Sequence, residues 1–182
     1  MSENIIQNKK NPIVFILDVD GVMTPGNFFY SADGKVMKIF GADDNDALSI
    51  LSKFLEIRFI TGDRKGFNIS QARIERDMGF KLDLVSTVKR LDWINDRYDL
   101  SQVIYMGDGI FDHYVMKNIL YSIAPVNADK TAKKHADFVT ERAGGDRAAA
   151  EAALHIMNKF FEAYNPESPL DSKMDLSGEW IT

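Results

Sequence analysis

The sequence of 182 residues contains no cysteine and has few histidines. The absence of cysteine excludes disulfides and thiolate metal sites, so a reducing compartment is compatible with the chain. The 3 histidines are scattered without the spacing of metal ligands. No uninterrupted apolar run approaches the roughly 18 residues of a membrane helix, and the polar N-terminal stretch lacks the apolar centre of a secretory signal. We therefore expect a cytoplasmic protein without a membrane partner.

An excess of basic charge is also missing. The 22 Lys and Arg residues face 27 Asp and Glu residues, which gives a formal net charge of -5. Such a balance offers no electrostatic footprint for nucleic acid or for anionic membranes. The length and the 45% apolar content suit one compact domain. We predict a single domain over residues 1–164 and an extended tail over residues 165–182, with Trp180 as the bulky aromatic residue of the tail.

Short apolar runs alternate with segments of helical periodicity. The run over residues 13–17 is unbroken and rich in branched side chains, which predicts a central parallel strand that is buried on both faces. Further strands are predicted at residues 57–60, 82–85, 103–106, 122–124 and 138–139, and helices at residues 46–54, 69–78, 88–98, 111–118 and 147–164. This alternation predicts an α/β fold, namely a doubly wound, Rossmann-like parallel sheet flanked by helices.

One segment departs from this rhythm. Residues 27–30 and 36–40 flank the sequence Ser-Ala-Asp-Gly, and Asp-Gly between two apolar runs predicts a β-hairpin. The hairpin would project after the first strand. It is too apolar for an isolated two-stranded ribbon in water, so we expect it to pack against another surface, such as a second subunit. The apolar residues concerned are Phe28, Phe29, Tyr30, Val36, Met37, Ile39 and Phe40.

Acidic residues follow two of the predicted strands. Asp18 and Asp20 end the first strand, and Asp108 and Asp112 follow the strand at residues 103–106. Ligands bind at the carboxyl edge of open α/β sheets, and residues two apart in an extended segment point the same way. A turn or a helix cap explains any one of these acids. The complete set instead predicts a Mg²⁺ site, because clustered carboxylates repel one another unless a hard cation is bound.

Two further residues suit a phosphate site. Thr61 follows the strand at residues 57–60, and its hydroxyl with the backbone amides after it, beginning at Gly62, can bind phosphate oxygens near a helix start. A helix cap is the alternative for Thr61. Lys89 begins the helix after the third strand, where its ammonium group would neutralise phosphate and keep a nucleophilic carboxylate ionised. A solvated surface lysine is the alternative there.

These residues together resemble the motifs of the haloacid dehalogenase superfamily of phosphotransferases. The pattern reads Asp18-Val-Asp20, then Thr61, then Lys89, then Gly107-Asp108 through Asp112, in the order of that superfamily. Within it the chain is similar to the capless branch that contains 3-deoxy-D-manno-octulosonate 8-phosphate phosphatases and nonulosonate 9-phosphate phosphatases. This likeness rests on the sequence after Asp18, the early hairpin, the absence of a cap-sized insertion, and Thr-Glu-Arg-Ala-Gly-Gly at residues 140–145.

The resemblance implies a two-step hydrolysis with Mg²⁺ as cofactor. Asp18 would attack phosphorus to form an aspartyl phosphate, and Asp20 would protonate the leaving oxygen and then activate water. The metal would be held by the Asp18 carboxylate, the backbone carbonyl of Asp20 and Asp108, with Asp112 supporting the metal shell or positioning Lys89.

The same resemblance implies a partner and a substrate class. The substrate would be a phosphorylated sugar acid, and the branch forms homotetramers in which hairpins of neighbouring subunits help to close each site. Candidate substrate-binding residues are Thr61, Gly62, Arg64, Lys89, Arg142, Gly144 and Gly145.

The chain departs from the family pattern at two places. Relatives often carry Arg directly after Thr-Gly, where this chain has Asp63 followed by Arg64. After the hairpin, relatives usually have Arg-Asp-Gly where this chain has Asp43, Asp44 and Asn45. An acidic residue near a sugar-acid carboxylate would repel it, so these positions bear on which sugar is used.

Two other functional classes share some of these features. A receiver-type signalling domain also has acids at strand ends, a Thr and a Lys, but its phosphorylated Asp follows the third strand, and this chain has none there. A non-catalytic, phosphatase-like oligomerisation domain attached to sugar-nucleotide synthesis is the second alternative. The intact Asp18, Asp20, Lys89 and Asp108 favour the enzyme.

Overall fold

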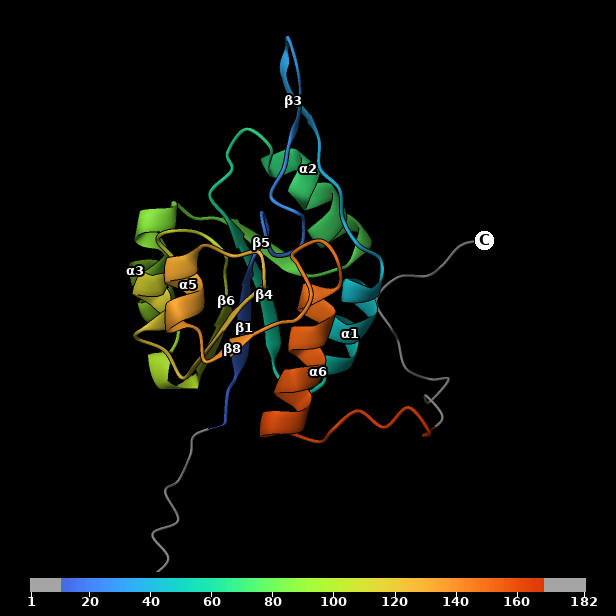
Figure 1. The fold of residues 1–182 in the computed structure, drawn as a ribbon, viewed down its shortest axis with the longest axis vertical. Coiled ribbons are helices and arrows are strands. Elements are labelled where there is room, and N and C mark those ends of the chain that lie inside the picture. The colour runs from blue at the N-terminus through green and yellow to red at the C-terminus, as the bar shows by residue number, and fades with distance from the viewer. Residues whose placement is uncertain (1–10, 169–182) are drawn as a thin grey trace, which may run out of the picture.

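A computed structural model describes residues 11–168 of the chain. Its main sheet is parallel throughout and has the strand order β5-β4-β1-β6-β7-β8, which confirms the predicted doubly wound fold (Figure 1). The strand order reverses beside β1. Strands β4 and β5 lie on one side of β1, and the chain then crosses to β6, β7 and β8 on the other side. The strands are β1 (Val14–Asp18), β4 (Glu56–Thr61), β5 (Lys81–Leu84), β6 (Val103–Met106), β7 (Tyr121–Ala124) and β8 (Phe138–Val139).

Side chains of β1 alternate between two hydrophobic clusters, one on each face of the sheet. Phe15 and Leu17 pack in the cluster beneath α1 (Asp43–Leu51) and α6 (Ala148–Phe160). Val14 and Ile16 pack on the opposite face beneath a second group of helices. Figure 1 shows the two helix layers on either side of the strands. The second group consists of α3 (Arg90–Asn95), α4 (His113–Met116) and α5 (Lys130–His135). Because β1 lies inside the sheet with helices packed on both faces, it is buried along its whole length.

The helix predicted at residues 69–78 is not a single α-helix. It begins as α2 (Phe67–Gln71) and continues as the π-helical segment η1 (Ala72–Asp77). The helix predicted at residues 88–98 likewise begins as the 3₁₀ segment η2 (Thr87–Lys89) and becomes α3, and a further 3₁₀ segment, η3 (Leu100–Gln102), precedes β6. The change of helical pitch alters which side chains face the sheet, and it affects one predicted site residue described below.

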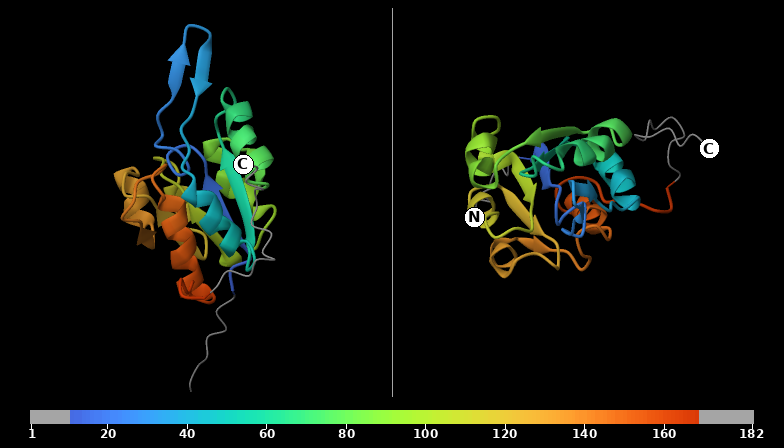
Figure 2. Two further views of the ribbon diagram at one scale, coloured as in Figure 1. Left: turned by 90° about the vertical axis from the view of Figure 1, so that its right-hand side faces the viewer. Right: turned by 90° about the horizontal axis from the view of Figure 1, so that it is seen from above.

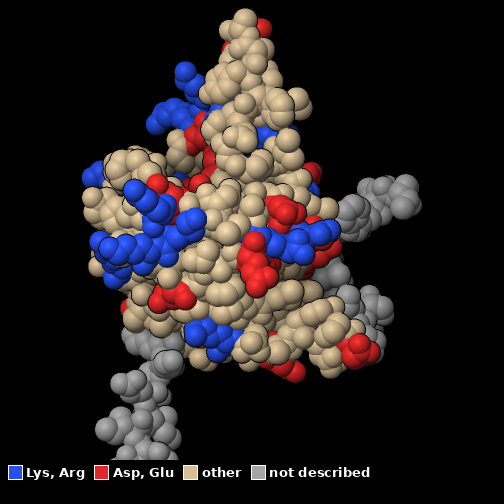
Figure 3. Space-filling model, in the orientation of Figure 1, with Lys and Arg blue, Asp and Glu red and all other residues tan. Residues whose placement is uncertain are grey.

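The predicted hairpin is confirmed. Strands β2 (Phe29–Ser31) and β3 (Gly34–Met37) pair in antiparallel fashion and extend away from the body of the molecule (Figure 2). Its apolar side chains are exposed, with Tyr30 at 63% and Met37 at 55%. The projecting end of the molecule is accordingly poor in charged groups in Figure 3. That the hairpin packs against another surface, such as a second subunit, stays a prediction.

The C-terminal boundary is described only in part. Helix α6 ends at Phe160, and residues 162–168 are exposed and lack regular structure. The remainder of the predicted tail, including Trp180, lies outside the described residues. Within residues 11–168, none of the helices has the length and apolar character needed to cross a bilayer.

A buried carboxylate joins the two helices on one face of the sheet. Asp44 is fully buried in α1, and its Oδ1 atom accepts a hydrogen bond of 2.9 Å from the backbone amide of Ala150 in the first turn of α6. The first amides of a helix have no partner within it, so Asp44 acts as a cap supplied by another helix. Burial raises the pKa of Asp44, and the bond from Ala150 opposes that rise. The contact fixes where α6 begins and therefore where the loop before it lies.

We predict that Asp44→Ala lowers the free energy of unfolding by about 1–3 kcal/mol, because the Ala150 amide is then buried without its acceptor. Urea denaturation followed by circular dichroism measures the change. Asp46→Ala is the matched control, since Asp46 belongs to the same helix but is exposed, and it should change stability by less than about 0.5 kcal/mol. Equal losses in the two variants would contradict the capping role.

Candidate active site

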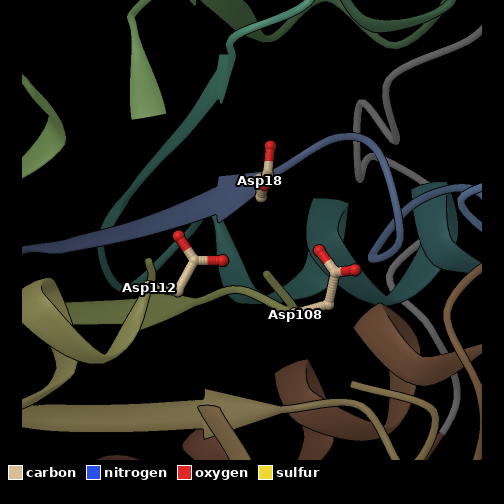
Figure 4. Close-up of side chains that lie close together, drawn as sticks. All are labelled: Asp18, Asp108 and Asp112. Carbon is tan, nitrogen blue, oxygen red and sulfur yellow. The ribbon is translucent and has the colours of Figure 1, made fainter. Parts of the chain in front are cut away.

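Three carboxylates meet at the carboxyl edge of the sheet. Strands β1 and β6 are parallel neighbours with Leu17 opposite Met106, so the residues that follow them come together. Asp18 ends β1, and Asp108 and Asp112 lie in the loop after β6 (Figure 4). Oxygen atoms of these acids lie within 4.8 Å of one another. This edge, next to the strand at which the sheet order reverses, is where open α/β sheets bind ligands. The predicted convergence of these acids is found.

A buried arginine holds two of the acids. The Nη1 atom of Arg90 donates to Asp18 Oδ2 and to Asp112 Oδ1, at 2.7 Å each, and lies 2.8 Å from the hydroxyl of Tyr105. That hydroxyl donates to Asp112 at 2.7 Å, while the Gly109 amide donates to the other Asp112 oxygen at 2.8 Å. Asp112 is fully buried. Its acceptor sites are therefore occupied from several directions, which fixes the carboxylate.

The expectation that Lys89 provides the cation of the site is not met by the structure. Lys89 has a side chain that is 72% exposed and lies 3.6 Å from Asp92, whereas the Arg90 side chain is only 3% exposed. The cause is the start of α3, where Arg90 and Ile94, four residues apart, form the buried face of the helix. Lys89 precedes this face and points to solvent. The sequence spacing alone does not separate the two residues, because Trp93 lies four residues after Lys89 just as Ile94 lies four residues after Arg90.

The charge of the acid cluster is only partly compensated. Burial raises the pKa of Asp18 to about 6, against the opposing effect of Arg90, with Asp112 and Asp20 adding to the rise. Burial likewise raises the pKa of Asp108 to about 8, and the neighbouring Asp18 and Asp112 raise it further. One guanidinium group therefore does not neutralise three acids. A set of carboxylate oxygens with excess negative charge fits a hard divalent cation.

The approach of Asp108 to the loop after β1 depends on a glycine. Gly21 has a φ of 91°, and a Cβ atom at this position would lie 1.9 Å from Asp108 Oδ2. Any other residue would displace that carboxylate from the cluster and strain the backbone. The positive φ also turns the chain sharply, so the loop at Asp20 leaves the direction of β1.

Asp20 consequently faces a different set of partners from Asp18. The alternation expected for an extended segment does not apply, because β1 ends at Asp18 and residues 20–23 form a turn. Asp20 Oδ2 accepts hydrogen bonds from Thr61 at 3.2 Å and from Lys38 at 3.0 Å. The Thr61 hydroxyl in turn accepts a bond of 3.1 Å from the Asp63 amide. Thr61 and Asp20 are thus brought together as predicted, whereas Lys38 was not among the expected site residues.

The glycine pair at residues 144 and 145 packs against the same loop. A Cβ atom on Gly144 would lie 1.8 Å from the carbonyl oxygen of Gly21. The Gly144 amide donates to Asn127 Oδ1 at 2.8 Å, and the Gly145 amide donates to the carbonyl of Val22 at 3.0 Å. These contacts support the loop that carries Asp20. A contact of the two glycines with substrate stays a prediction.

The remaining candidate residues lie at the surface. Gly62 and Arg64 are exposed in the turn after β4, where the Arg64 amide donates to the Gly62 carbonyl at 3.0 Å. Arg142 is also exposed, and it lines a surface groove together with Asp43 and Glu151 rather than the acid cluster. Arg142 thus lies apart from the acid cluster, and its contact with substrate stays a prediction.

Comparisons with known proteins agree with this geometry. The family model described as haloacid dehalogenase-like hydrolase matches residues 85–146, which include Arg90, Asp108 and Asp112. The 3-deoxy-D-manno-octulosonate 8-phosphate phosphatase of Salmonella typhi is 27% identical over 161 residues, covering 83% of this chain and 82% of the relative.

Solved structures give the same likeness. The cobalt-bound deoxy-D-mannose-octulosonate 8-phosphate phosphatase of Haemophilus influenzae is 26% identical with a TM-score of 0.72, covering 81% of this chain and 88% of that chain. The Moraxella catarrhalis 3-deoxy-D-manno-octulosonate 8-phosphate phosphatase, solved with magnesium ion, phosphate ion and a KDO molecule, shares the fold at 23% identity and a TM-score of 0.71, covering 84% and 89%. The chain is therefore similar to haloacid dehalogenase-like hydrolases over residues 85–146, and over most of its length it resembles the 3-deoxy-D-manno-octulosonate 8-phosphate phosphatases.

Proposed function

We propose that the protein is a Mg²⁺-dependent phosphomonoester hydrolase that removes phosphate from a phosphorylated sugar acid through an aspartyl phosphate on Asp18. The observation that carries this proposal is the position of Asp18. It lies buried at the end of the central strand, held by Arg90, with Asp108 and Asp112 oxygens within 4.8 Å. A fixed carboxylate beside a cation site is the arrangement that covalent phosphoryl transfer requires.

In the first step a carboxylate oxygen of Asp18 attacks phosphorus, and the bond from phosphorus to the sugar oxygen breaks. Asp20 donates a proton to that leaving oxygen, so the sugar departs as a neutral alcohol. In the second step Asp20 takes a proton from water, and the water oxygen attacks the phosphorus of the aspartyl phosphate. Inorganic phosphate leaves, and Asp18 is restored as a carboxylate.

Arg90 takes the role that the sequence motif assigns to Lys89. Its guanidinium group donates to Asp18 Oδ2 at 2.7 Å and so keeps the nucleophile oriented and favours its ionised form. The same nitrogen orients Asp112. Arginine is suited to this buried position because its planar group makes several directed hydrogen bonds at once.

The donor set fits Mg²⁺, which prefers oxygen ligands. We infer that Asp18 and Asp108 would hold the ion through their carboxylates, Asp20 through its backbone carbonyl, and that Asp112 would support this shell. Bound Mg²⁺ would supply positive charge that offsets the repulsion between the anionic nucleophile and the phosphate. Burial raises the pKa of Asp18 to about 6 and that of Asp108 to about 8, neighbouring acids add to both rises, and a bound cation would favour the ionised forms.

The sugar-acid substrate is supported by how the two departures from the family pattern are compensated. Asp63 pairs with the ammonium groups of Lys35 and Lys38. Burial alone would raise the pKa of Asp63, but the hydrogen bonds from these lysines outweigh it and lower the pKa to about 2. Asp43 pairs with Arg147. Both acidic replacements are therefore neutralised by the chain itself and need not repel a carboxylate on the substrate.

The proposal extends to assembly and boundaries. The exposed apolar hairpin supports a homotetramer in which hairpins from neighbouring subunits help to close each site, as the resemblance implies. The catalytic domain spans residues 1–164. A phosphorylated sugar is then the small-molecule partner.

Asp18→Asn should abolish Mg²⁺-dependent phosphate release, with a loss of about 10³-fold or more, because an amide oxygen cannot form the covalent intermediate. The assay is release of inorganic phosphate from 3-deoxy-D-manno-octulosonate 8-phosphate, nonulosonate 9-phosphates and hexose phosphates. The volume of the side chain is nearly unchanged, so circular dichroism should report an intact fold. Turnover retained in this variant would exclude Asp18 as the nucleophile.

Substitutions of the neighbouring residues Lys89 and Arg90 should have sharply different effects on kcat/KM. Lys89→Gln should leave kcat/KM within about twofold of wild type, because its side chain is exposed, whereas Arg90→Lys should lower it by about 10-fold or more, since an ammonium group cannot reproduce the bonds to Asp18 and Asp112. The comparison uses the same phosphate-release assay. A larger loss in Lys89→Gln than in Arg90→Lys would restore Lys89 as the cation of the site.

Metal-free protein should become less stable as pH rises. The pKa of the Asp108 carboxyl group is raised from 3.8 to about 8, so the folded state binds its proton more tightly than the unfolded state does. The contribution of this group to the free energy of unfolding is therefore complete below pH 4 and is lost as pH rises through 8. We predict that Asp108→Asn raises the melting temperature in EDTA at pH 8.5 more than at pH 5.5. Mg²⁺ should stabilise wild type at pH 8.5 and stabilise Asp108→Asn far less. Differential scanning fluorimetry measures the melting temperature in each condition, and identical Mg²⁺ shifts in the two proteins would exclude Asp108 as a ligand.

A further inference from the structure

Lys38 is a charged residue in an apolar part of the chain. It follows β3, where the hairpin returns to the body of the molecule. Its neighbours Met37 and Ile39 are 55% and 53% exposed, yet the Lys38 side chain is fully buried. The chain therefore directs a cation inward from a segment whose apolar side chains point outward. Burying an ammonium group is costly unless it is paired and hydrogen-bonded, so the contacts it makes are expected to be specific.

The ammonium group of Lys38 contacts three side chains. It lies 2.7 Å from Oδ1 and 3.0 Å from Oδ2 of Asp20, and it donates to the latter. It also donates to the hydroxyl of Ser70 at 2.8 Å and lies 2.9 Å from Asp63 Oδ2. An ammonium group has three N–H donors. With three partners at hydrogen-bonding distance, Lys38 occupies one position, and the carboxylate of Asp20 is fixed between Lys38 and the Thr61 hydroxyl.

The charge arrangement assigns Lys38 chiefly to Asp20. Asp63 has a second cation, because Lys35 pairs with the same Oδ2 atom. Asp20 has Lys38 as its ion-pair partner among the contacts of residues 11–168. Lys35 reaches Asp63 and stacks over the ring of Phe28, with its Nζ atom 3.3 Å from the ring centroid. Both lysines of the hairpin therefore pair with Asp63. Of the two, only Lys38 also pairs with Asp20, the residue that is proposed to transfer the proton.

We propose that Lys38 is a positioning residue that orients Asp20 for proton transfer, so that the base of the hairpin forms part of the acid–base apparatus. The inference rests on the proposed function, in which Asp20 protonates the leaving sugar oxygen. Proton transfer by a positioned group typically contributes about 10²–10⁴-fold to rate, and it depends on the group lying within hydrogen-bond reach of the reacting atom. Loss of the Lys38 contact would free the Asp20 side chain to rotate.

The test compares two leaving groups. An alkyl sugar phosphate needs a proton on its leaving oxygen, whereas p-nitrophenyl phosphate releases a stabilised phenolate that needs none. Lys38→Met should lower kcat/KM about 10²-fold for the sugar phosphate that wild type hydrolyses fastest, and less than about fivefold for p-nitrophenyl phosphate. The ratio kcat/KM reports the transfer of phosphate to Asp18 and excludes the later hydrolysis step. Lys35→Met is the matched control, and because Asp63 keeps its ion pair with Lys38 in that variant, the ratio of the two substrates should stay nearly unchanged.

A double variant separates positioning from other roles. If Lys38 acts through Asp20, adding Lys38→Met to Asp20→Asn should cause no further loss with the sugar phosphate. Equal losses on both substrates, or a full further loss in the double variant, would overturn the proposal and indicate contact with the phosphate or a purely structural role. Ser70→Ala is tested in parallel in case Lys38→Met does not fold, and it should shift the substrate ratio in the same direction by a smaller factor. Wild-type protein without Mg²⁺-dependent release from either substrate would instead refute the proposed function.

Discussion

The bond network around Arg90 is the constraint on which the site depends. Its buried guanidinium group is shared by Asp18 at the end of β1 and Asp112 in the loop after β6. Burial lowers the pKa of an arginine, but the neighbouring Asp18, Tyr105 and Asp112 outweigh this and raise the pKa of Arg90 well above its usual value. A permanent cation in this position lets two carboxylates remain buried together. Without it, the end of β1 and the loop after β6 would repel each other.

Arg90 nevertheless leaves the cluster short of positive charge. Asp108 receives no hydrogen bond from it, and burial with the nearby Asp18 and Asp112 raises the pKa of Asp108 to about 8. The backbone instead leaves room for Asp108, since Gly21 leaves the space that its carboxylate occupies and Gly144 packs against the carbonyl of Gly21. The fold therefore admits an acid at a position that is electrostatically unfavourable. A bound divalent cation would relieve the repulsion among these acids. The stability of the site should therefore depend strongly on metal.

The sequence was sufficient for the sheet and for most of the acid cluster. Strand positions, the hairpin and the convergence of Asp18 with Asp108 and Asp112 follow from apolar runs and from the rule for carboxyl edges. The motif order points to Lys89 as the cation, whereas the structure buries Arg90, because a motif does not give the helical phase and η2 shifts that phase just before α3. The sequence does not indicate the role of Lys38, because nothing local distinguishes a buried lysine from an exposed one. Only the packing of the hairpin base against β4 and α2 brings it to Asp63 and Ser70.

The two acids of the Asp-Val-Asp motif end in separate networks, and this division suits the proposed chemistry. Asp18 must remain a carboxylate to attack phosphorus, and it is held by Arg90, a cation that does not lose its proton. Asp20 must both give and take a proton, and it is held by Lys38 and Thr61 in a partly exposed position that water and a leaving group can reach. The turn after Asp18, made possible by Gly21, separates the two carboxylates. A straight strand would have directed both acids toward the same cation and left one of them without a distinct role.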